Sequence, residues 1–326
     1  MADPIRDFKY RQLLFGKIEW EEVLSRIAAV KSDCLKECAD AFALNLSRTG
    51  AFGAMPVQIA HMVRRDQIFF DNAIFKITGK GDIKLSDFSG EPSFEVKAEA
   101  NRQMVEYRSK PEIERTALAF TMGINYVETL IAAHPTMRDA ADAIFASIVS
   151  NSWTAFESLA SDLWVAGVDN GPQEISGRLA LSNQLQKGEE NITHKTLHSV
   201  ESDFRTQHGS WLREVGKVSF QRLDHIKLYY GIAFEDRCRN LFDDTAGGYI
   251  VALAAIRNAL THKSGIADKK FVKDAQRFTE LNAIKVGEPI LLDGEFVQKL
   301  RIAAAELGAE LIAHVDKLIT PQAAKS

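Results

Sequence analysis

Apolar residues recur every three or four positions along much of the chain, the spacing that gathers side chains on one face of an α-helix. The first such run covers residues 20–46, and Gly50 stands where this helix would end. After a loose segment at residues 50–56, a shorter helical run covers residues 57–65. We therefore expect one long helix and one short helix in this part of the chain.

The pattern changes after residue 72. The runs AIFKIT and DIKLSDF, at residues 73–78 and 82–88, flank a turn made of Gly79, Lys80 and Gly81. Two short runs on either side of a glycine-containing turn predict a small β-hairpin.

Polar and charged residues then fill residues 90–110, and Pro111 opens the next element. This change of composition suggests a domain boundary. We expect a helical region with a small hairpin at residues 1–110 and a helical domain at residues 111–326. The expected fold class is therefore mainly α, with a smaller α+β part at the amino-terminal end.

Beyond Pro111 the helical spacing returns and predicts an antiparallel helical bundle with insertions. Glycines interrupt the mostly helical interval 173–244, and a hairpin is expected over residues 281–292, turning at Gly287. The helices expected in this domain cover residues 112–134, 137–168, 249–263, 267–278 and 294–319.

The composition of the chain limits the classes of function that we expect for the protein. The net charge of −4 gives no global attraction to nucleic acid or anionic lipid, although a local basic groove remains possible. The amino end does not resemble a signal peptide, and no run approaches the length of a membrane span. Three cysteines make neither a disulfide framework nor a zinc site. We expect a cytoplasmic protein that does not bind membranes.

The helix near residue 255 carries the candidate site. Every residue from 249 to 260 is apolar except Arg257 and Asn258, and His262 follows one turn later. A helix that is apolar on all sides is normally buried between other helices, and a buried arginine needs a polar partner. We therefore take Arg257, Asn258 and His262 as candidate catalytic residues. The alternative is a chance spacing in which His262 only caps the helix.

Helical geometry separates these three side chains. At about 100° per residue, Asn258 and His262 share one side of the helix, whereas Arg257 and His262 lie roughly 140° apart. A second copy related by a twofold axis would bring two arginines and two histidines toward a common cleft. Such a cleft suits RNA cleavage, because imidazoles can move the protons and a guanidinium can hold the phosphate without a metal or other cofactor.

Glu157 and Thr261 are candidates for supporting roles. Glu157 lies beside Trp153 and Phe156 on the helix expected at residues 137–168. It is either a carboxylate near the solvent or a polar partner that reaches toward Arg257.

His194 and His198 are four residues apart, a spacing that can place two imidazoles on one metal ion. No third ligand is evident in the sequence, so a surface helix is the favoured interpretation. No metal ligand is assigned.

The segment Arg257-Asn258-Ala259-Leu260-Thr261-His262, followed by Gly265 and Asp268, resembles the signature of the HEPN superfamily. The resemblance covers residues 112–319 except for the poorly fitting interval 173–244. It implies a helical bundle that forms a homodimer, with the motif of each copy lining a shared cleft.

Many members of that superfamily are metal-independent endoribonucleases that act as toxins or in defence against phage. The resemblance thus implies an RNA substrate, an antitoxin or regulatory protein as a further partner, catalytic roles for Arg257 and His262, and a supporting role for Asn258. The superfamily also contains inactive members, so the alternative is a helical interaction module that binds a protein or a nucleotide.

Overall fold

The computed structural model describes residues 8–15, 20–79, 91–182, 207–214, 218–244 and 248–320. Within these ranges the chain is helical and contains no strand, so the mainly α class is confirmed. The one sheet-type pairing among them is an isolated bridge between Ile266 and Pro289. The helices are α1 (Tyr10–Phe15), α2 (Trp20–Ala28), α3 (Asp33–Thr78), α4 (Phe94–Ser109), α5 (Glu112–Ala133), α6 (Pro135–Asn170), α7 (Gln173–Leu181), α10 (His208–Glu214), α11 (Leu223–Asp244), α12 (Tyr249–Lys263), α13 (Lys269–Ala275) and α14 (Gly294–Ile319).

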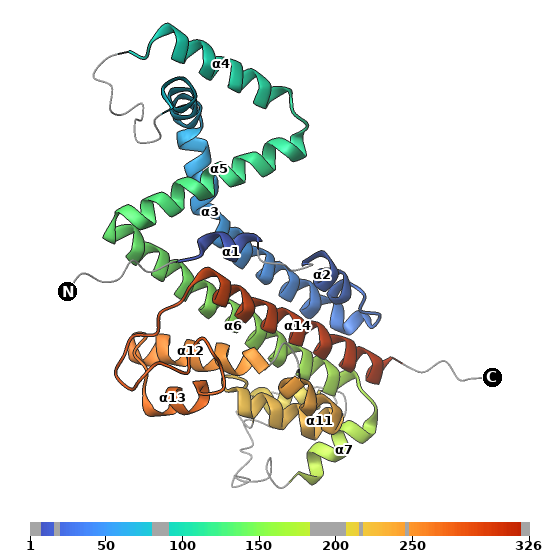
Figure 1. Cartoon of the computed structure of the whole chain (residues 1–326). Coiled ribbons are helices and arrows are strands. Elements are labelled where there is room, and N and C mark those ends of the chain that lie inside the picture. Colours follow the sequence, from blue (N-terminus) through green and yellow to red (C-terminus); the bar gives the residue numbers. More distant parts are fainter. Residues whose placement is uncertain are drawn as a thin grey trace.

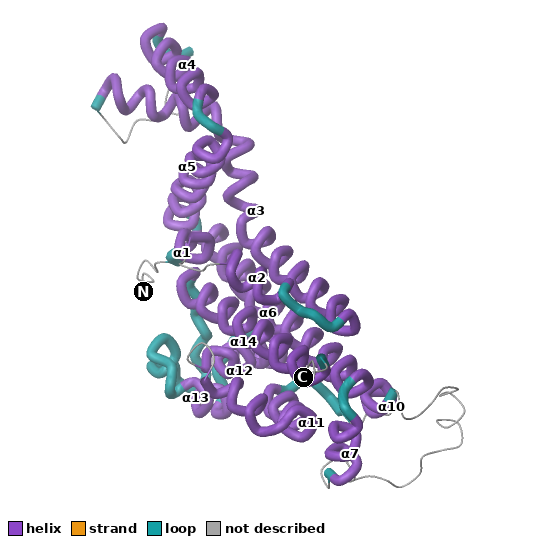
Figure 2. The backbone as a smooth tube through the Cα atoms, turned by 90° about the vertical axis from the view of Figure 1, so that its right-hand side faces the viewer, coloured by secondary structure: helices purple, strands orange, loops and turns teal. Residues whose placement is uncertain are grey.

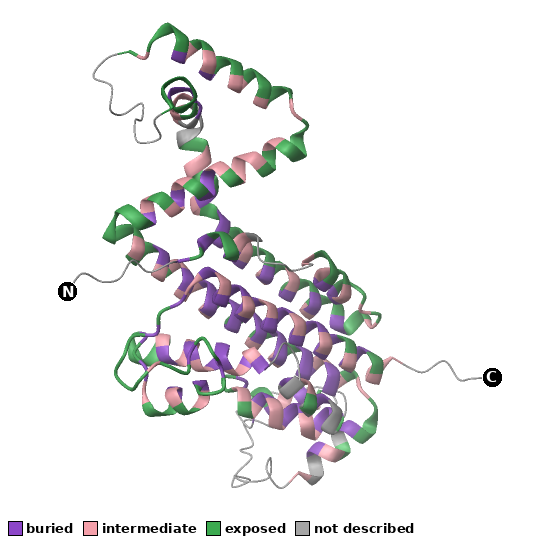
Figure 3. Ribbon diagram, in the orientation of Figure 1, coloured by how far each residue is buried: buried purple, intermediate pink, exposed green. Residues whose placement is uncertain are grey.

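The helices α6 and α14 form the centre of a bundle. They lie side by side in both views, with α1, α2 and the first half of α3 on one side and α11, α12 and α13 on the other (Figures 1 and 2). Figure 3 shows the buried residues concentrated along α6 and α14. This arrangement follows from composition, since both helices carry apolar or small residues over most of their surface.

The first expected helix, over residues 20–46, is two helices. The helical conformation ends with α2 at Ala28, and a new helix, α3, begins at Asp33. The break exposes backbone N–H groups at Lys31 and Ser32, and these donate to the Asp316 carboxylate of α14 at 3.0 and 2.8 Å. Burial is the largest single influence and opposes the ionisation of Asp316, but the two N–H groups together with the hydroxyls of Ser32 and Thr320 lower its pKa. The carboxylate thereby ties the start of α3 to the end of the chain.

Gly50 does not end a helix, because α3 continues through it and through Pro56 to Thr78. A Cβ at Gly50 would lie 3.0 Å from the Arg301 guanidinium of α14. Arg301 is buried, donates to Gln298 at 2.9 Å and lies over the Trp20 ring. Burial lowers the pKa of Arg301 to about 10, so it stays charged at neutral pH. The glycine therefore leaves space for a buried arginine.

The second half of α3 leaves the bundle and forms an arm with α4 and α5 (Figures 1 and 2). The first strand of the expected hairpin, residues 73–78, is the last part of α3, and residues 80–90 lie outside the described ranges. Ala73 and Ile74 pack in a small cluster with Val96 and Ala100 of α4, which explains why this run is helical. The expected α+β character of this region is thus not supported.

The second expected hairpin is also wrong. Residues 281–292 form turns, and the loop around Gly287 pairs with the segment after α12 instead of with itself. Ala267 donates its backbone N–H to Glu288, and Ile290 donates to Gly265, at 2.9 and 2.8 Å. This pairing holds α12 and the start of α14 together.

The boundary expected near residue 110 coincides with the turn between α4 and α5. Residues on both sides of it share the main core, since Phe42 of α3 packs in the same cluster as Phe145 of α6. Among the described helices, α5 alone has the length and composition of a membrane span, which the count of apolar runs missed. In this structure α5 packs against α3 and α6.

Gly308 tests the close packing of α14. A Cβ at this position would overlap the Phe42 ring of α3 and lie 3.0 Å from Leu159 of α6. We expect Gly308→Ala to lower the free energy of unfolding by about 1–3 kcal/mol, measured by urea denaturation. Gly177 of α7 is the matched control, because its Cβ would meet no atom within 4 Å. Gly177→Ala should be neutral or stabilising, and equal effects at both positions would contradict the packing argument.

The Asp316 cap should make stability depend on pH. Because its pKa is lowered in the folded state, its contribution is complete above the unfolded-state pKa and is lost as the pH falls through the folded-state pKa. At neutral pH we expect Asp316→Asn to cost about 1–3 kcal/mol in urea denaturation. The difference from wild type should shrink below about pH 4. Asp33→Asn, which changes an exposed carboxylate on α3, should have a much smaller effect at neutral pH.

Candidate functional site

The helix α12 is flanked by Gly248 and Ser264, which are both in the left-handed conformation. No side chain caps its start. At its end Gly265, with φ +77°, donates its N–H to Ala259 at 3.0 Å and stops the helix. His262 therefore lies in the last turn, with its side chain exposed.

From residue 249 to 260 every residue of α12 is buried or half-buried, as its composition predicts, and only the last three residues of the helix are exposed. Ile250, Leu253 and Ile256 are fully buried, and α12 packs against α6 and α14. Asn258 is half-buried on the opposite side, in line with His262 one turn later. Thr261 is exposed. The apolar face anchors the helix, and the polar residues occupy its margins.

Arg257 lies at the edge of the buried face and contacts Glu157 of α6. The distance between Arg257 Nη2 and Glu157 Oε2 is 3.6 Å, and the two side chains are 22% and 23% exposed. The same carboxylate oxygen accepts a hydrogen bond of 2.8 Å from the buried Trp153 indole. Arg257 Nη1 also donates to Asn258 Oδ1 at 3.2 Å. Of the two interpretations of Glu157, the contact with Arg257 is the one observed.

Asn258 and His262 line a pocket of about 300 Å³ between α12 and α13. Three cationic side chains, Arg222, Lys263 and Lys270, line the same pocket together with two carboxylates. Arg222 is paired with Asp224, which raises its pKa. Neither lysine forms an ion pair with a residue in the described ranges. The pocket thus presents an imidazole and an amide next to two ammonium groups outside any ion pair of the described residues, and two carboxylates, Asp268 and Asp274, share the lining.

Gly265 and Asp268, which extend the motif, have structural roles that the structure makes explicit. Gly265 adopts a positive φ that favours glycine. Asp268 lines the pocket, but its Oδ1 accepts a hydrogen bond of 2.8 Å from the backbone N–H of Phe271 and so caps α13. Both residues fix the direction in which the chain leaves α12.

Arg257 does not line the pocket that holds His262. This separation agrees with the angular difference expected from helical geometry. Within one chain the site therefore consists of two parts, joined by the hydrogen bond from Arg257 to Asn258. The pocket residues Arg222 and Lys270 were not expected from the sequence, because Arg222 lies in the bend before α11, Lys270 lies on α13, and neither matches a local motif.

The alternative metal pair, His194 and His198, lies outside the described residues. In the ranges that are described, no group of three His, Cys, Asp or Glu side chains is placed to hold a metal ion. Comparisons of the chain with protein-family models, curated proteins and solved structures gave no match.

The Arg257–Glu157 contact can be tested by a double-mutant cycle in urea denaturation. Glu157→Gln keeps an acceptor for Trp153 but removes the charge, and Arg257→Met removes the partner. We expect a coupling of about 1 kcal/mol, because both side chains are largely withdrawn from solvent. The exposed Arg213–Asp162 pair is the control, with an expected coupling of a few tenths of a kcal/mol. Equal coupling in the two pairs would mean that Glu157 does not hold Arg257.

Proposed function

We propose that the protein is a cytoplasmic, metal-independent endoribonuclease of the HEPN type that acts as a homodimer on single-stranded or looped RNA. The observation that carries the proposal is the position of Asn258 and His262 in one pocket lined by Lys263 and Lys270. Unneutralised ammonium groups attract the phosphate backbone of RNA even when the net charge of the protein is negative.

The reaction is attack of a ribose 2′-hydroxyl on the adjacent phosphorus. A neutral imidazole takes the hydroxyl proton, the bond from phosphorus to the 5′-oxygen breaks, and an imidazolium gives a proton to the leaving oxygen. The products carry a 2′,3′-cyclic phosphate and a 5′-hydroxyl. Flexible RNA suits this reaction, because a 2′-hydroxyl in a loop can reach the position in line with the leaving oxygen.

The reaction needs two proton-transferring groups and one group that binds the phosphate. The pocket of one chain holds one histidine, and Arg257 lies outside it. A twofold dimer in which α12 of each copy faces the other would supply a second His262 and an Arg257 to each pocket. Asn258, which accepts from Arg257, would then orient the guanidinium toward the shared cleft. A role in toxicity or phage defence, with an antitoxin partner, follows from the family resemblance.

One observation favours a second candidate function. The Arg257 guanidinium already faces a carboxylate, Glu157, and a phosphate must compete with it. In a non-catalytic HEPN-type interaction module this pair would be purely structural, and the lysines of the pocket would bind an acidic protein partner or a nucleotide. The two candidate functions differ in whether His262 takes part in the cleavage of RNA.

RNA cleavage in EDTA separates these functions. We expect the wild type to produce fragments with 2′,3′-cyclic phosphate ends and His262→Ala to be at least about 100-fold slower, as for loss of a general acid or base. His134→Ala is the matched control, because His134 is exposed at the junction of α5 and α6. Its activity should equal that of the wild type.

The outcomes are distinct. Absence of cleavage across varied RNAs would exclude the nuclease proposal, and equal cleavage by wild type and His262→Ala would exclude the site. Light scattering at micromolar concentration tests the shared cleft, since an active strict monomer contradicts it. Mixing wild-type chains with an excess of His262→Ala chains should lower the activity of the wild-type chains if each pocket combines residues of both copies, because a mixed dimer holds one His262 instead of two.

A further inference from the structure

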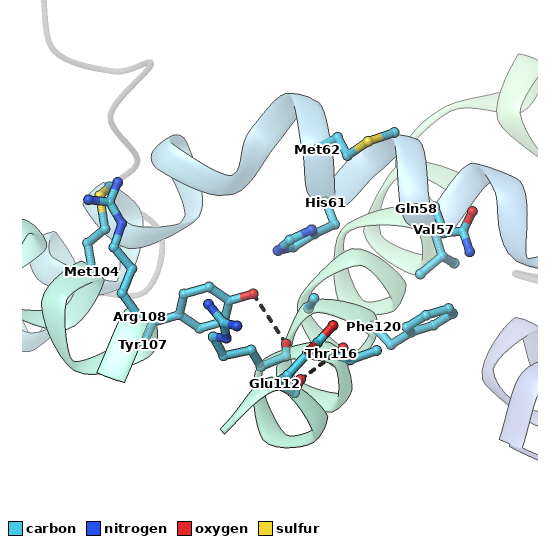
Figure 4. A pocket seen from close by; sticks show the side chains of 12 residues that line it. Val57, Gln58, His61, Met62, Met104, Tyr107, Arg108, Glu112, Thr116 and Phe120 are labelled. Atoms are coloured by element: carbon cyan, nitrogen blue, oxygen red, sulfur yellow. Dashed lines mark hydrogen bonds between the residues drawn. The ribbon is translucent and has the colours of Figure 1, made fainter. Parts of the chain in front are cut away.

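A second pocket lies in the arm, between α3, α4 and α5. Its volume is about 610 Å³, within the range of roughly 300–1,000 Å³ that is usual for small-molecule sites. Figure 4 shows that its walls come from all three helices, with His61 on α3, Tyr107 on α4 and Glu112 and Thr116 on α5. We call it the arm pocket. No residue of the proposed nuclease site lines it.

Two guanidinium groups line the arm pocket, that of the exposed Arg108 and that of the half-buried Arg115. Neither Arg108 nor Arg115 forms a side-chain hydrogen bond or ion pair with any residue in the described ranges. The Nε of Arg115 is buried and has no acceptor. A buried donor without an acceptor is unfavourable, so an anionic oxygen placed in the pocket would satisfy it. Glu112 is the one carboxylate that lines the pocket, and His61 is the remaining titratable group besides Tyr107.

The other walls are aromatic and apolar. The ring of Tyr107 lies 6.5 Å from that of His61 and 5.6 Å from that of Phe69, measured between centroids. Its hydroxyl donates to the backbone oxygen of Arg115 at 3.2 Å, which joins α4 to α5 (Figure 4). Phe120 lines the far side. The ring positions are thus fixed by contacts within the arm.

We propose that the arm pocket binds a nucleoside phosphate. Its guanidinium groups suit the phosphate, its aromatic walls suit a planar base, and a carboxylate such as Glu112 can accept from ribose hydroxyls. An inorganic anion would leave most of the volume unfilled, and an apolar ligand would leave the Arg115 Nε without an acceptor. The same chemistry is offered by a free nucleotide and by one nucleotide of an RNA strand.

Isothermal titration calorimetry on the full chain tests the proposal without any dependence on cleavage. The probes are the four nucleoside monophosphates, adenosine, inorganic phosphate, and a short 2′-O-methylated RNA that cannot undergo attack by a 2′-hydroxyl. We expect at least one monophosphate or the RNA to bind at least about tenfold more tightly than adenosine or phosphate alone. Arg115→Ala should weaken this binding at least about tenfold, as for loss of a charged hydrogen bond.

Two further variants separate binding from folding. Ala119→Phe fills the pocket from α5 while leaving both arginines in place, and it should weaken binding at least about tenfold. Arg102→Ala is the matched control, because Arg102 lies on α4, is exposed and pairs with Glu99 outside the pocket. Its affinity should not change. Circular dichroism checks that each variant retains its helices, and Arg115→Lys replaces Arg115→Ala if the latter unfolds.

Tighter binding of the methylated RNA than of every monophosphate, lost in Ala119→Phe, assigns the pocket to an RNA strand. Equal or tighter binding of a monophosphate assigns it to a free nucleotide. The proposal is overturned if no probe binds at millimolar concentration, or if Ala119→Phe binds like the wild type. Because no step requires cleavage, these results stand whether or not the protein is a nuclease.

Discussion

The carboxylate of Glu157 is what allows α12 to carry an arginine at the edge of the core. The helix must bury Leu253 and Ile256 against α6 and α14, and this places the neighbouring Arg257 where little solvent reaches it. A guanidinium in that position requires a partner to offset its lost hydration. Glu157 and Asn258 supply it, and Trp153 in turn fixes the carboxylate. The position of the arginine is therefore determined by contacts between two helices that are about a hundred residues apart.

This constraint divides the polar residues of α12 between two sides. Arg257 faces α6, whereas Asn258 and His262 face the pocket beside α13. A rotation of the helix that brought Arg257 into the pocket would bury polar groups and expose Leu253. Both changes would raise the free energy of the folded chain. In the proposed nuclease, a second copy would therefore supply the arginine that acts with the histidine on one phosphate. If the chain acts alone, Lys263 and its neighbours must bind the phosphate, and Arg257 is then a structural residue.

The sequence predicts α5, α6 and α14 closely, because sustained periodicity over 20 or more residues has few alternative interpretations, whereas it divides α3 wrongly. Single glycines and short apolar runs, in contrast, give wrong predictions of where helices end and strands begin. The local pattern predicts a helix end at Gly50, but the role of this glycine depends on Arg301, some 250 residues later in the chain. The run containing Ile74 predicts a strand but is helical, because short apolar runs do not distinguish strand from helix and its packing partners lie on α4. The motif in α12 was local and could be found, whereas Arg222 reaches the pocket only through the tertiary fold.

The arm differs from the bundle in how it is stabilised. Its own core cluster consists of five buried residues, namely Phe69, Ala73, Ile74, Val96 and Ala100, whereas the main core extends over the whole bundle. Such a small core leaves a low free energy of local unfolding, so α4 and the end of α3 should open more readily than α6 or α14. A ligand that contacts all three helices of the arm would stabilise the closed arm by mass action, in proportion to the logarithm of its concentration above its dissociation constant. A binding site between weakly packed helices therefore makes the order of the arm depend on its occupant, whereas the order of the bundle does not.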